Sequence, residues 1–162
     1  MEMRRKDRAR GEDFSLELID RCSHGVMALQ TGEDTPYCLP LSFVRVDRAL
    51  YFHCAHQGRK VELMRAHPKV CLTFVGSDRP AYLDKGEYTT FFQSAIVTGT
   101  VREVTDEEEK ILALRALCQK LTPQAMDGDK FQNAVSRSLS ATGVWCVDMD
   151  EISGKEKAPK KT

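Results

Sequence analysis

The stretch that decides the fold is PYCLPLSFVRVDRALYFHCAHQGRK, residues Pro36–Lys60. Its first part, Tyr37–Val46, is rich in β-branched and aromatic residues and is interrupted only by Pro40, which predicts a strand. A second strand is predicted over Ala49–Ala55 after a short turn, so the two segments should form a hairpin. A glycine and two cations follow, and a helix is predicted to begin at about Lys60.

The end of this hairpin is a candidate phosphate site. Gly58 lets the backbone approach a ligand closely, and Arg59 and Lys60 add positive charge beside the first N–H groups of a helix. Cations at a helix N-terminus are disfavoured by the helix dipole, so two of them there favour a bound anion. The alternative that both side chains simply face solvent stays open.

Length and composition favour one globular domain and exclude some functions. The chain has 162 residues, 41% of them hydrophobic, and 24 basic residues balance 24 acidic ones. A net charge of zero argues against a dedicated nucleic-acid binder. The cysteines form no CxxC motif, and neither a secretory signal nor a membrane-spanning apolar run is visible. We expect a cytoplasmic protein with no metal site and no membrane partner.

The two ends of the chain are basic. The segment Met1–Arg10 carries an excess of arginine and lysine, and residues 155–162 contain four lysines and one glutamate. We interpret residues 1–154 as a single domain and residues 155–162 as a flexible basic tail. A second interpretation is that one of these ends closes over an anionic ligand.

The remaining periodicity predicts further helices and strands. Helices are expected at Ser15–Arg21, Arg59–Ala66, from a capping box at Thr105–Glu108 to Leu121, and at Asp129–Leu139. Strands are expected at Val26–Gln30, Val70–Val75, Thr89–Val104 and Val144–Met149, with a loop or excursion at Gly76–Gly86 and a bulge or sharp bend at Gly99. Because the strands do not alternate with helices, we predict an α+β fold that is mainly β, a six-stranded antiparallel split β-barrel with flanking helices.

Several short motifs together resemble the pyridoxamine 5'-phosphate oxidase-like FMN-binding split barrels, closest to the 5-nitroimidazole reductase (Nim-type) branch. They are MRRKDR (Met3–Arg8), PYCLPLSFV (Pro36–Val44), YFHCAHQGRK (Tyr51–Lys60), HPKVCLTFVG (His67–Gly76), TTFFQSAIVTG (Thr89–Gly99) and DEISGK (Asp150–Lys155). Their order and spacing cover almost the whole chain. The arginine and histidine two residues apart that bind substrate in true pyridoxamine-phosphate oxidases are not found near the C-terminus, so vitamin B6 oxidation is not expected.

The resemblance implies a homodimer with FMN at the subunit interface, and it implies roles for individual residues. Pro40, Leu41, Ser42 and Phe43 would lie along the flavin ring, and His53, Cys54 and Ala55 would lie near the ring and the ribityl chain. Gly58, Arg59 and Lys60 would hold the phosphate, as the residues themselves suggest. Gln93, Ser94 and Ala95 would complete the pocket from the other subunit.

The function that follows is an FMN-dependent oxidoreductase. It would reduce a small aromatic or nitro compound with electrons from a reduced nicotinamide donor or another cellular reductant, and His53 could be the catalytic proton donor. A structural role for His53 and a packing role for Cys54 remain as alternatives. So do a non-catalytic flavin-binding or storage protein, and a module for another cofactor such as heme or deazaflavin.

Overall fold

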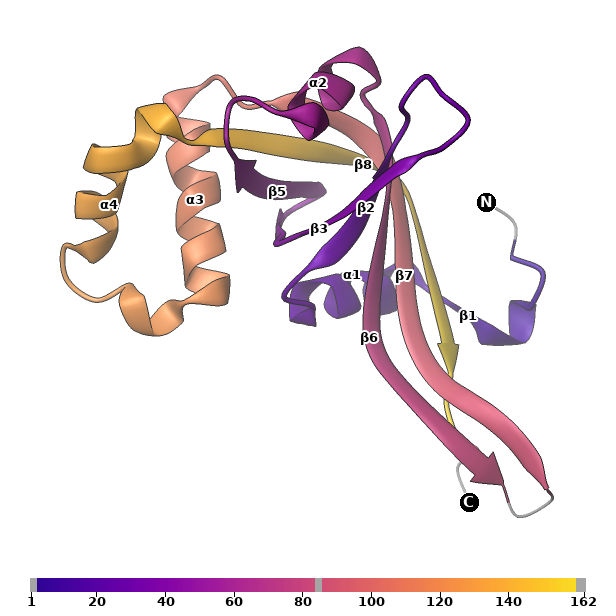
Figure 1. Ribbon diagram of the computed structural model, residues 1–162. Helices are drawn as coiled ribbons and strands as arrows, with labels where there is room; N and C mark the ends of the chain where they lie inside the picture. Colours follow the sequence, from indigo (N-terminus) through magenta and orange to yellow (C-terminus); the bar gives the residue numbers. More distant parts are fainter. Residues whose placement is uncertain (1–2, 84–85, 160–162) are drawn as a thin grey trace.

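A computed structural model describes residues 3–83 and 86–159 and shows one curled antiparallel sheet with helices around it (Figure 1). Its strands are β1 (Ala9–Arg10), β2 (Gly25–Leu29), β3 (Tyr37–Leu41), β4 (Val44–Val46), β5 (Ala49–Cys54), β6 (Lys69–Leu83), β7 (Glu87–Glu103) and β8 (Gly143–Lys157). They are ordered β3-β2-β6-β7-β8-β5-β4, and β1 pairs with β8. The predicted mainly β class with flanking helices is confirmed.

The sheet is open, which corrects the predicted six-stranded barrel. Within residues 3–83 and 86–159 it has eight strands and ends in β3 on one side and β4 on the other, and these two edges do not pair. Only Ser42 and Phe43 join them, so the Cα atoms of Leu41 and Val44 lie within about 11 Å of each other. The sheet must therefore roll until its edges face each other across a split. The fully buried ring of Phe43 fills this split.

In the described part of the chain there are four α-helices: α1 (Glu12–Arg21), α2 (Arg59–Ala66), α3 (Glu107–Leu121) and α4 (Lys130–Ser138). The first three pack on the sheet, and α4 lies beside α3 (Figure 1). Short 3-10 turns lie at η1 (Lys6–Arg8), η2 (Pro123–Ala125) and η3 (Leu139–Ala141). The helices α1 and α2 bury apolar side chains in the main core, and α3 packs on a second cluster beside β4 and β5. Within the described residues, no helix is long and apolar enough to cross a membrane.

Two helix starts differ from the prediction. Helix α1 begins at Glu12, three residues before the predicted Ser15, with Gly11 as its N-cap. The bounds predicted for α2 are confirmed. In α3 the N-cap is Asp106, whose carboxylate accepts a hydrogen bond from the amide of Glu109 at 2.8 Å. The prediction placed the cap at Thr105. Aspartate is the stronger N-cap of the two, and the spacing of Thr105 and Glu108, which resembles a capping box, pointed one residue too early.

The predicted hairpin over Tyr37–Ala55 is only partly right. β4 does pair with β5, but β3 pairs with β2 instead, with Pro40 opposite Val26. The strand breaks between β3 and β4, where Phe43 turns into the core. Burial of an aromatic ring therefore ends a strand that residue propensities alone would continue.

Three strands are longer than predicted and form a projecting arm (Figure 1). β6 continues through residues 76–83, where a loop was expected, because it stays paired with β7. β8 continues to Lys157, so the predicted tail begins at least three residues too early. Residues 155–157 are held by pairing with β7, and Lys155 also pairs with β1. Residues 160–162 lie outside the described part. The bulge predicted at Gly99 is confirmed as a register shift against β8.

Candidate functional site

The corner between β5 and α2 has the backbone geometry of an anion site. Gly58 is the N-cap of α2. Its backbone has φ of 116° and ψ of 168°, a conformation that residues other than glycine rarely adopt. A Cβ atom placed there would meet nothing within 4 Å, so the space in front of the helix is open. Arg59 and Lys60 are the first two residues of the helix, and the amides that bond back to the Gly58 carbonyl begin at Val61. The amides of the first two residues precede this bonding pattern and are suited to an anion.

The cations of this corner are close to two strands. The guanidinium of Arg59 lies 5.0 Å from the centre of the Tyr37 ring, so the start of α2 meets the start of β3. Lys60 is half-buried and its charge acts on Cys54, the last residue of β5. Gly58, Arg59 and Lys60 thus lie together at the corner between β5 and α2, and a phosphate group fits this set of donors.

Cys54 has the properties of a packing residue. Its thiol donates to the carbonyl oxygen of Ala55 at 3.2 Å. Burial raises the pKa of this thiol, against the opposing effect of the charge on Lys60. A reactive cysteine needs the opposite shift, because the thiolate is the nucleophile. The geometry therefore favours the packing role that the sequence left as an alternative.

The loop before Gly58 is fixed by residues that the sequence analysis did not single out. The His56 ring lies 3.1 Å from the carbonyl oxygen of Ser140 through Nε2 and 3.8 Å from Glu103 through Nδ1. Arg65 of α2 donates to the same Glu103 carboxylate at 2.8 Å. This cluster ties the loop to β7 and to the segment before β8. No local signal reveals it, because its members are far apart in the sequence.

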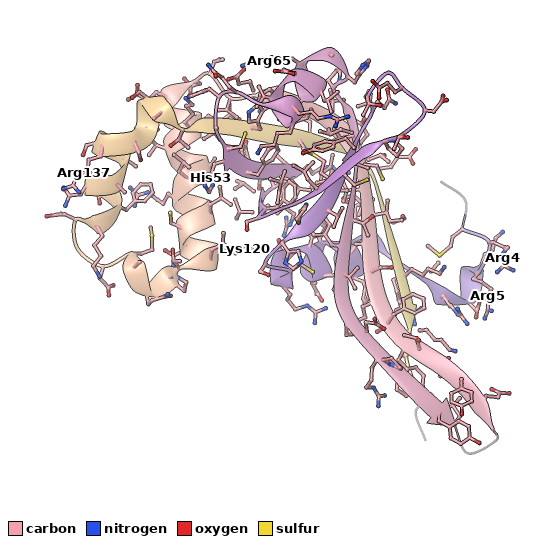
Figure 2. All side chains as sticks on the ribbon, in the orientation of Figure 1. Arg4, Arg5, His53, Arg65, Lys120 and Arg137 are labelled. Carbon is pink, nitrogen blue, oxygen red and sulfur yellow. The ribbon has the colours of Figure 1, made fainter. Side chains whose placement is uncertain are left out.

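His53 lies on a different face from Cys54. Alternation along β5 places His53 with Tyr51, which packs into the cluster under α3, whereas Cys54 faces the main core. Figure 2 shows His53 beside α3. Its side chain is exposed, as is that of Ala55. Within one chain, His53 and Cys54 therefore cannot both point their side chains at the same bound molecule.

The segment Pro40–Phe43 crosses the split between the two edges of the sheet. Pro40 and Ser42 are exposed, Leu41 is half-buried and Phe43 is fully buried. The Phe43 ring contacts two other core rings, so only its backbone is available to a ligand. Its carbonyl oxygen accepts from Lys120 at 2.9 Å, and Lys120 also donates to Ile19 at 3.2 Å. Burial lowers the pKa of Lys120.

The third predicted group, Gln93, Ser94 and Ala95, lies on β7, next to α1 and β6 rather than at the Gly58 corner. Ala95 is fully buried in its own chain, so its side chain cannot line a pocket for a partner. Gln93 is half-buried and donates through Nε2 to Glu156 at 2.7 Å. This contact could not be predicted, because its two partners are 63 residues apart in the sequence.

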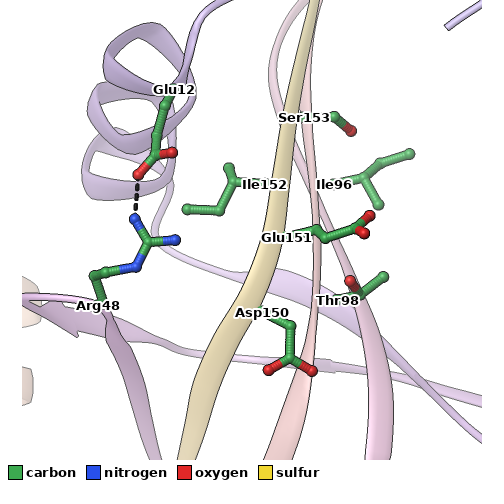
Figure 3. Close-up of a pocket in the computed structure, with 8 residues that line it drawn as sticks. All are labelled: Glu12, Arg48, Ile96, Thr98, Asp150, Glu151, Ile152 and Ser153. Carbon is green, nitrogen blue, oxygen red and sulfur yellow. Dashed lines mark hydrogen bonds and ion pairs between the residues drawn. The ribbon is translucent and has the colours of Figure 1, made fainter. Parts of the chain in front are cut away.

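A separate hollow of about 240 Å³ lies between α1, the turn before β5 and the bulge in β8 (Figure 3). Glu12, Asp150 and Glu151 line it, together with the cation of Arg48, which is paired with Glu12. The cations next to this hollow are already engaged by its carboxylates, Arg48 by Glu12 and Lys69 by Asp150, so the lining suits a phosphate poorly. Of these two places, the corner at Gly58 is the one whose groups suit a phosphorylated cofactor.

Comparison with known proteins places the chain in a familiar structural group. A family model described as pyridoxamine 5'-phosphate oxidase matches residues 12–156. A candidate 5-nitroimidazole antibiotic resistance protein from Bacteroides thetaiotaomicron is similar in structure, with 24% identity, 91% of this chain and 84% of that chain covered, and a TM-score of 0.78. A search of curated proteins found no match.

Two further similar structures are named for their cofactors. The flavocytochrome Anf3 from Azotobacter vinelandii has 21% identity over 98% of this chain and 73% of that one, with a TM-score of 0.79. An FAD and heme binding protein from Mycobacterium smegmatis has 19% identity over 94% of this chain and 75% of that one, with a TM-score of 0.74. At these identities the similarity shows a shared fold.

Proposed function

The chain belongs to the pyridoxamine 5'-phosphate oxidase family, and we propose that it is an FMN-dependent oxidoreductase that reduces a small aromatic or nitro compound. The observation that carries the proposal is the corner at Gly58, where an open helix N-terminus and two cations meet β3. One phosphate fits this corner, which favours FMN over a dinucleotide. The nitro substrate class is supported by the structural similarity to a candidate nitroimidazole resistance protein.

Each part of the corner has a defined task. When bound, the flavin supplies hydride and electron transfer. The first amides of α2, with Arg59 and Lys60, hold the phosphate, and Gly58 leaves room for it. The exposed backbone of Pro40 and Ser42 is available to the polar edge of the ring. His53, exposed on the face toward α3, donates a proton to the acceptor.

A homodimer would supply the rest of the pocket. One face of the sheet keeps small and apolar side chains at least partly exposed, including Val26 at 42% and Val75 at 60%. Strand register places further members on the same face: Cys38, Pro40, Ala28, Cys71, Thr73, Ile96 and Thr98. Burial of such a face against a second copy is favourable, because it removes apolar surface from water. Sedimentation should therefore give a dimer, and dilution through its dissociation range should release flavin.

The cofactor is tested by the absorption spectrum of the purified protein and by chromatography of the chromophore released on denaturation. The expected product is FMN. Release of FAD or heme would show that the protein binds that cofactor and not FMN. Failure to bind any flavin on reconstitution would refute the proposal.

The catalytic role is tested with His53→Ala. General-acid catalysis typically contributes about 10²–10⁴ in rate. The variant should keep its FMN but reoxidise the reduced flavin much more slowly with a nitroaromatic acceptor, whereas reoxidation by oxygen should change less. Equal rates in wild type and variant would make His53 a structural residue. If the wild-type protein reoxidises its reduced flavin no faster than free FMN does, the protein would be a flavin carrier and not an enzyme.

A further inference from the structure

The basic segment before α1 and the end of β8 lie together beside the projecting arm. Strand β1 pairs with β8, where Arg10 lies opposite Gly154. Gly154 permits this close approach, because a Cβ there would clash with Oγ of Ser15 and lie 3.3 Å from Cβ of Arg10. Residues 5–10 thereby border a hollow of about 850 Å³, which we call the arm hollow, and β6 and β7 of the arm form its other walls. Figure 2 shows Arg5 on this segment.

Two carboxylates of the arm hollow are already neutralised by arginines. Arg5 donates to Asp7 at 2.7 Å through Nε and at 2.6 Å through Nη2, and this contact holds the pKa of Asp7 at about 2. Arg10 donates to Glu156 at 2.9 Å through Nε. Both carboxylates stay ionised and paired at neutral pH, so neither is available to the other cations of the lining.

Two half-buried cations of the lining remain for a ligand. The guanidinium of Arg8 makes no hydrogen bond or ion pair with residues 3–83 and 86–159. Lys157 donates to Oγ1 of Thr89, and its ammonium lies 5.9 Å from the centre of the Phe91 ring. An ammonium group has further donors for an anion. Because a charge that is partly withdrawn from water is costly without a partner, this arrangement favours a bound anion.

The walls between these cations are mostly apolar. Leu83 and Phe91 of the arm line the hollow together with Pro159 beyond β8. Arg79 lies 5.0 Å from the centre of the Phe91 ring and adds positive charge near this wall. Glu87, exposed at the start of β7, is a single carboxylate against two unpaired cations. Such a lining suits an anionic group that carries an apolar body.

We propose that the arm hollow binds a small organic anion, a carboxylate or a phosphate ester with an apolar body. The anionic group lies between the guanidinium of Arg8 and the ammonium of Lys157, and the body lies against Leu83 and Phe91. A guanidinium binds either group through two parallel hydrogen bonds. The arm hollow shares no residue with the corner at Gly58, and this inference does not depend on the proposed function.

The test is calorimetric titration of the purified protein with 1-naphthyl phosphate and with 1-naphthoate. The neutral 1-naphthol, which has the same ring system, is the control ligand. The variants are Arg8→Gln and Lys157→Gln. The matched control is Arg4→Gln, because Arg4 is exposed on the same segment and does not line the arm hollow. A second control, Arg59→Ala with Lys60→Ala, removes the cations of the other anion site.

Arg8→Gln should weaken the anion about tenfold, and Lys157→Gln about threefold, because each removes charge-assisted hydrogen bonds. Weak binding of 1-naphthol should not change, which excludes a general loss of structure. The two controls should change anion binding by less than about twofold. A response of the phosphate ester alone identifies phosphate as the recognised group, and a response of 1-naphthoate alone identifies carboxylate.

The inference is wrong if the wild-type protein binds neither anion. It is also wrong if the Arg59 and Lys60 variant loses anion binding while Arg8→Gln keeps it, because the anion would then lie at the corner at Gly58. Neither result bears on the proposed function, which is decided separately by the chromophore that the protein binds.

Discussion

The corner at Gly58 and the bulge hollow, the hollow of about 440 Å³ between β6, β7 and the end of α1, are built in opposite ways. The corner takes its ligand-holding groups from one continuous run, the end of β5 and the first turn of α2. The bulge hollow takes its groups from α1, β6 and β7, and it depends on β1 and β8 for the orientation of Gln93. The corner uses backbone amides and charge, whereas the hollow uses side chains held by other side chains. The geometry of the corner should thus be altered by substitutions within the corner itself. The geometry of the bulge hollow should also be altered by substitutions in the distant strands that orient Gln93.

The largest effect is expected at the corner. Charge-assisted hydrogen bonds contribute about 1.5–3 kcal/mol each, so Arg59→Ala with Lys60→Ala should weaken FMN at least tenfold. Riboflavin, which lacks the phosphate, should bind the variant and the wild type equally weakly. Fluorescence titration with both ligands measures this difference.

The matched control is Arg21→Ala with Gln93→Ala, which alters the bulge hollow and leaves the corner intact. This pair should change FMN and riboflavin by the same factor, because neither residue is placed near the phosphate. An unchanged FMN dissociation constant in the Arg59 and Lys60 variant would show that the phosphate binds elsewhere.

This contrast explains how much could be predicted from the sequence. The corner was predictable, because glycine, two cations and a helix start are neighbours along the chain, and the bounds of α2 were correct. The bulge hollow was not, since the partner of Gln93 is Glu156 on another strand. The break at Phe43 was missed for the same reason. Core packing decides it, and local propensity for a strand does not reveal it.

The second effect concerns Lys120, which ties the crossing segment at Phe43 to α1. Burial lowers the pKa of Lys120, so the charge itself is not the stabilising part. The stabilisation comes instead from the hydrogen bonds that Lys120 donates to the carbonyl oxygens of Phe43 and Ile19. Lys120→Met leaves both oxygens without this donor. We expect a loss of about 2–3 kcal/mol in the free energy of unfolding, measured by urea denaturation.

Lys110→Met at the start of α3 is the control for this change and should shift the free energy of unfolding by no more than about 0.5 kcal/mol. If the proposed flavin contact with the segment before Phe43 is correct, Lys120→Met should also weaken riboflavin, which the Arg59 and Lys60 variant does not. A Lys120→Met protein as stable as wild type would show that desolvation of the ammonium group cancels its hydrogen bonds.

The third effect tests backbone strain at the corner. Gly58 has a φ of 116° and no neighbour within 4 Å of a Cβ, so Gly58→Ala adds strain without a clash. A conformation of this kind costs about 1–3 kcal/mol for other residues. We expect a loss of about 2 kcal/mol in stability and weaker FMN, because relaxation of the backbone would turn the first amides of α2 away. Thermal unfolding with and without FMN separates the two consequences, and an unchanged melting temperature would contradict the strain argument.

The smallest effect is expected at Gly76. Substitution by alanine should lower the stability here too, but through a steric clash and not through backbone strain. Its Cβ would lie 2.1 Å from Cδ1 of Leu18, the end of a side chain that can move. Overpacking of this kind costs about 1–3 kcal/mol, and movement of Leu18 should keep the loss for Gly76→Ala near about 1 kcal/mol. Leu18→Val removes the clashing atom, so the double variant should be more stable than the sum of the two single changes predicts. Additive stabilities in this cycle would show that the clash is relieved by the backbone of β6 instead, and the β6 bulge, the register shift between Val75 and Asp78, would then be flexible rather than a fixed wall of the bulge hollow.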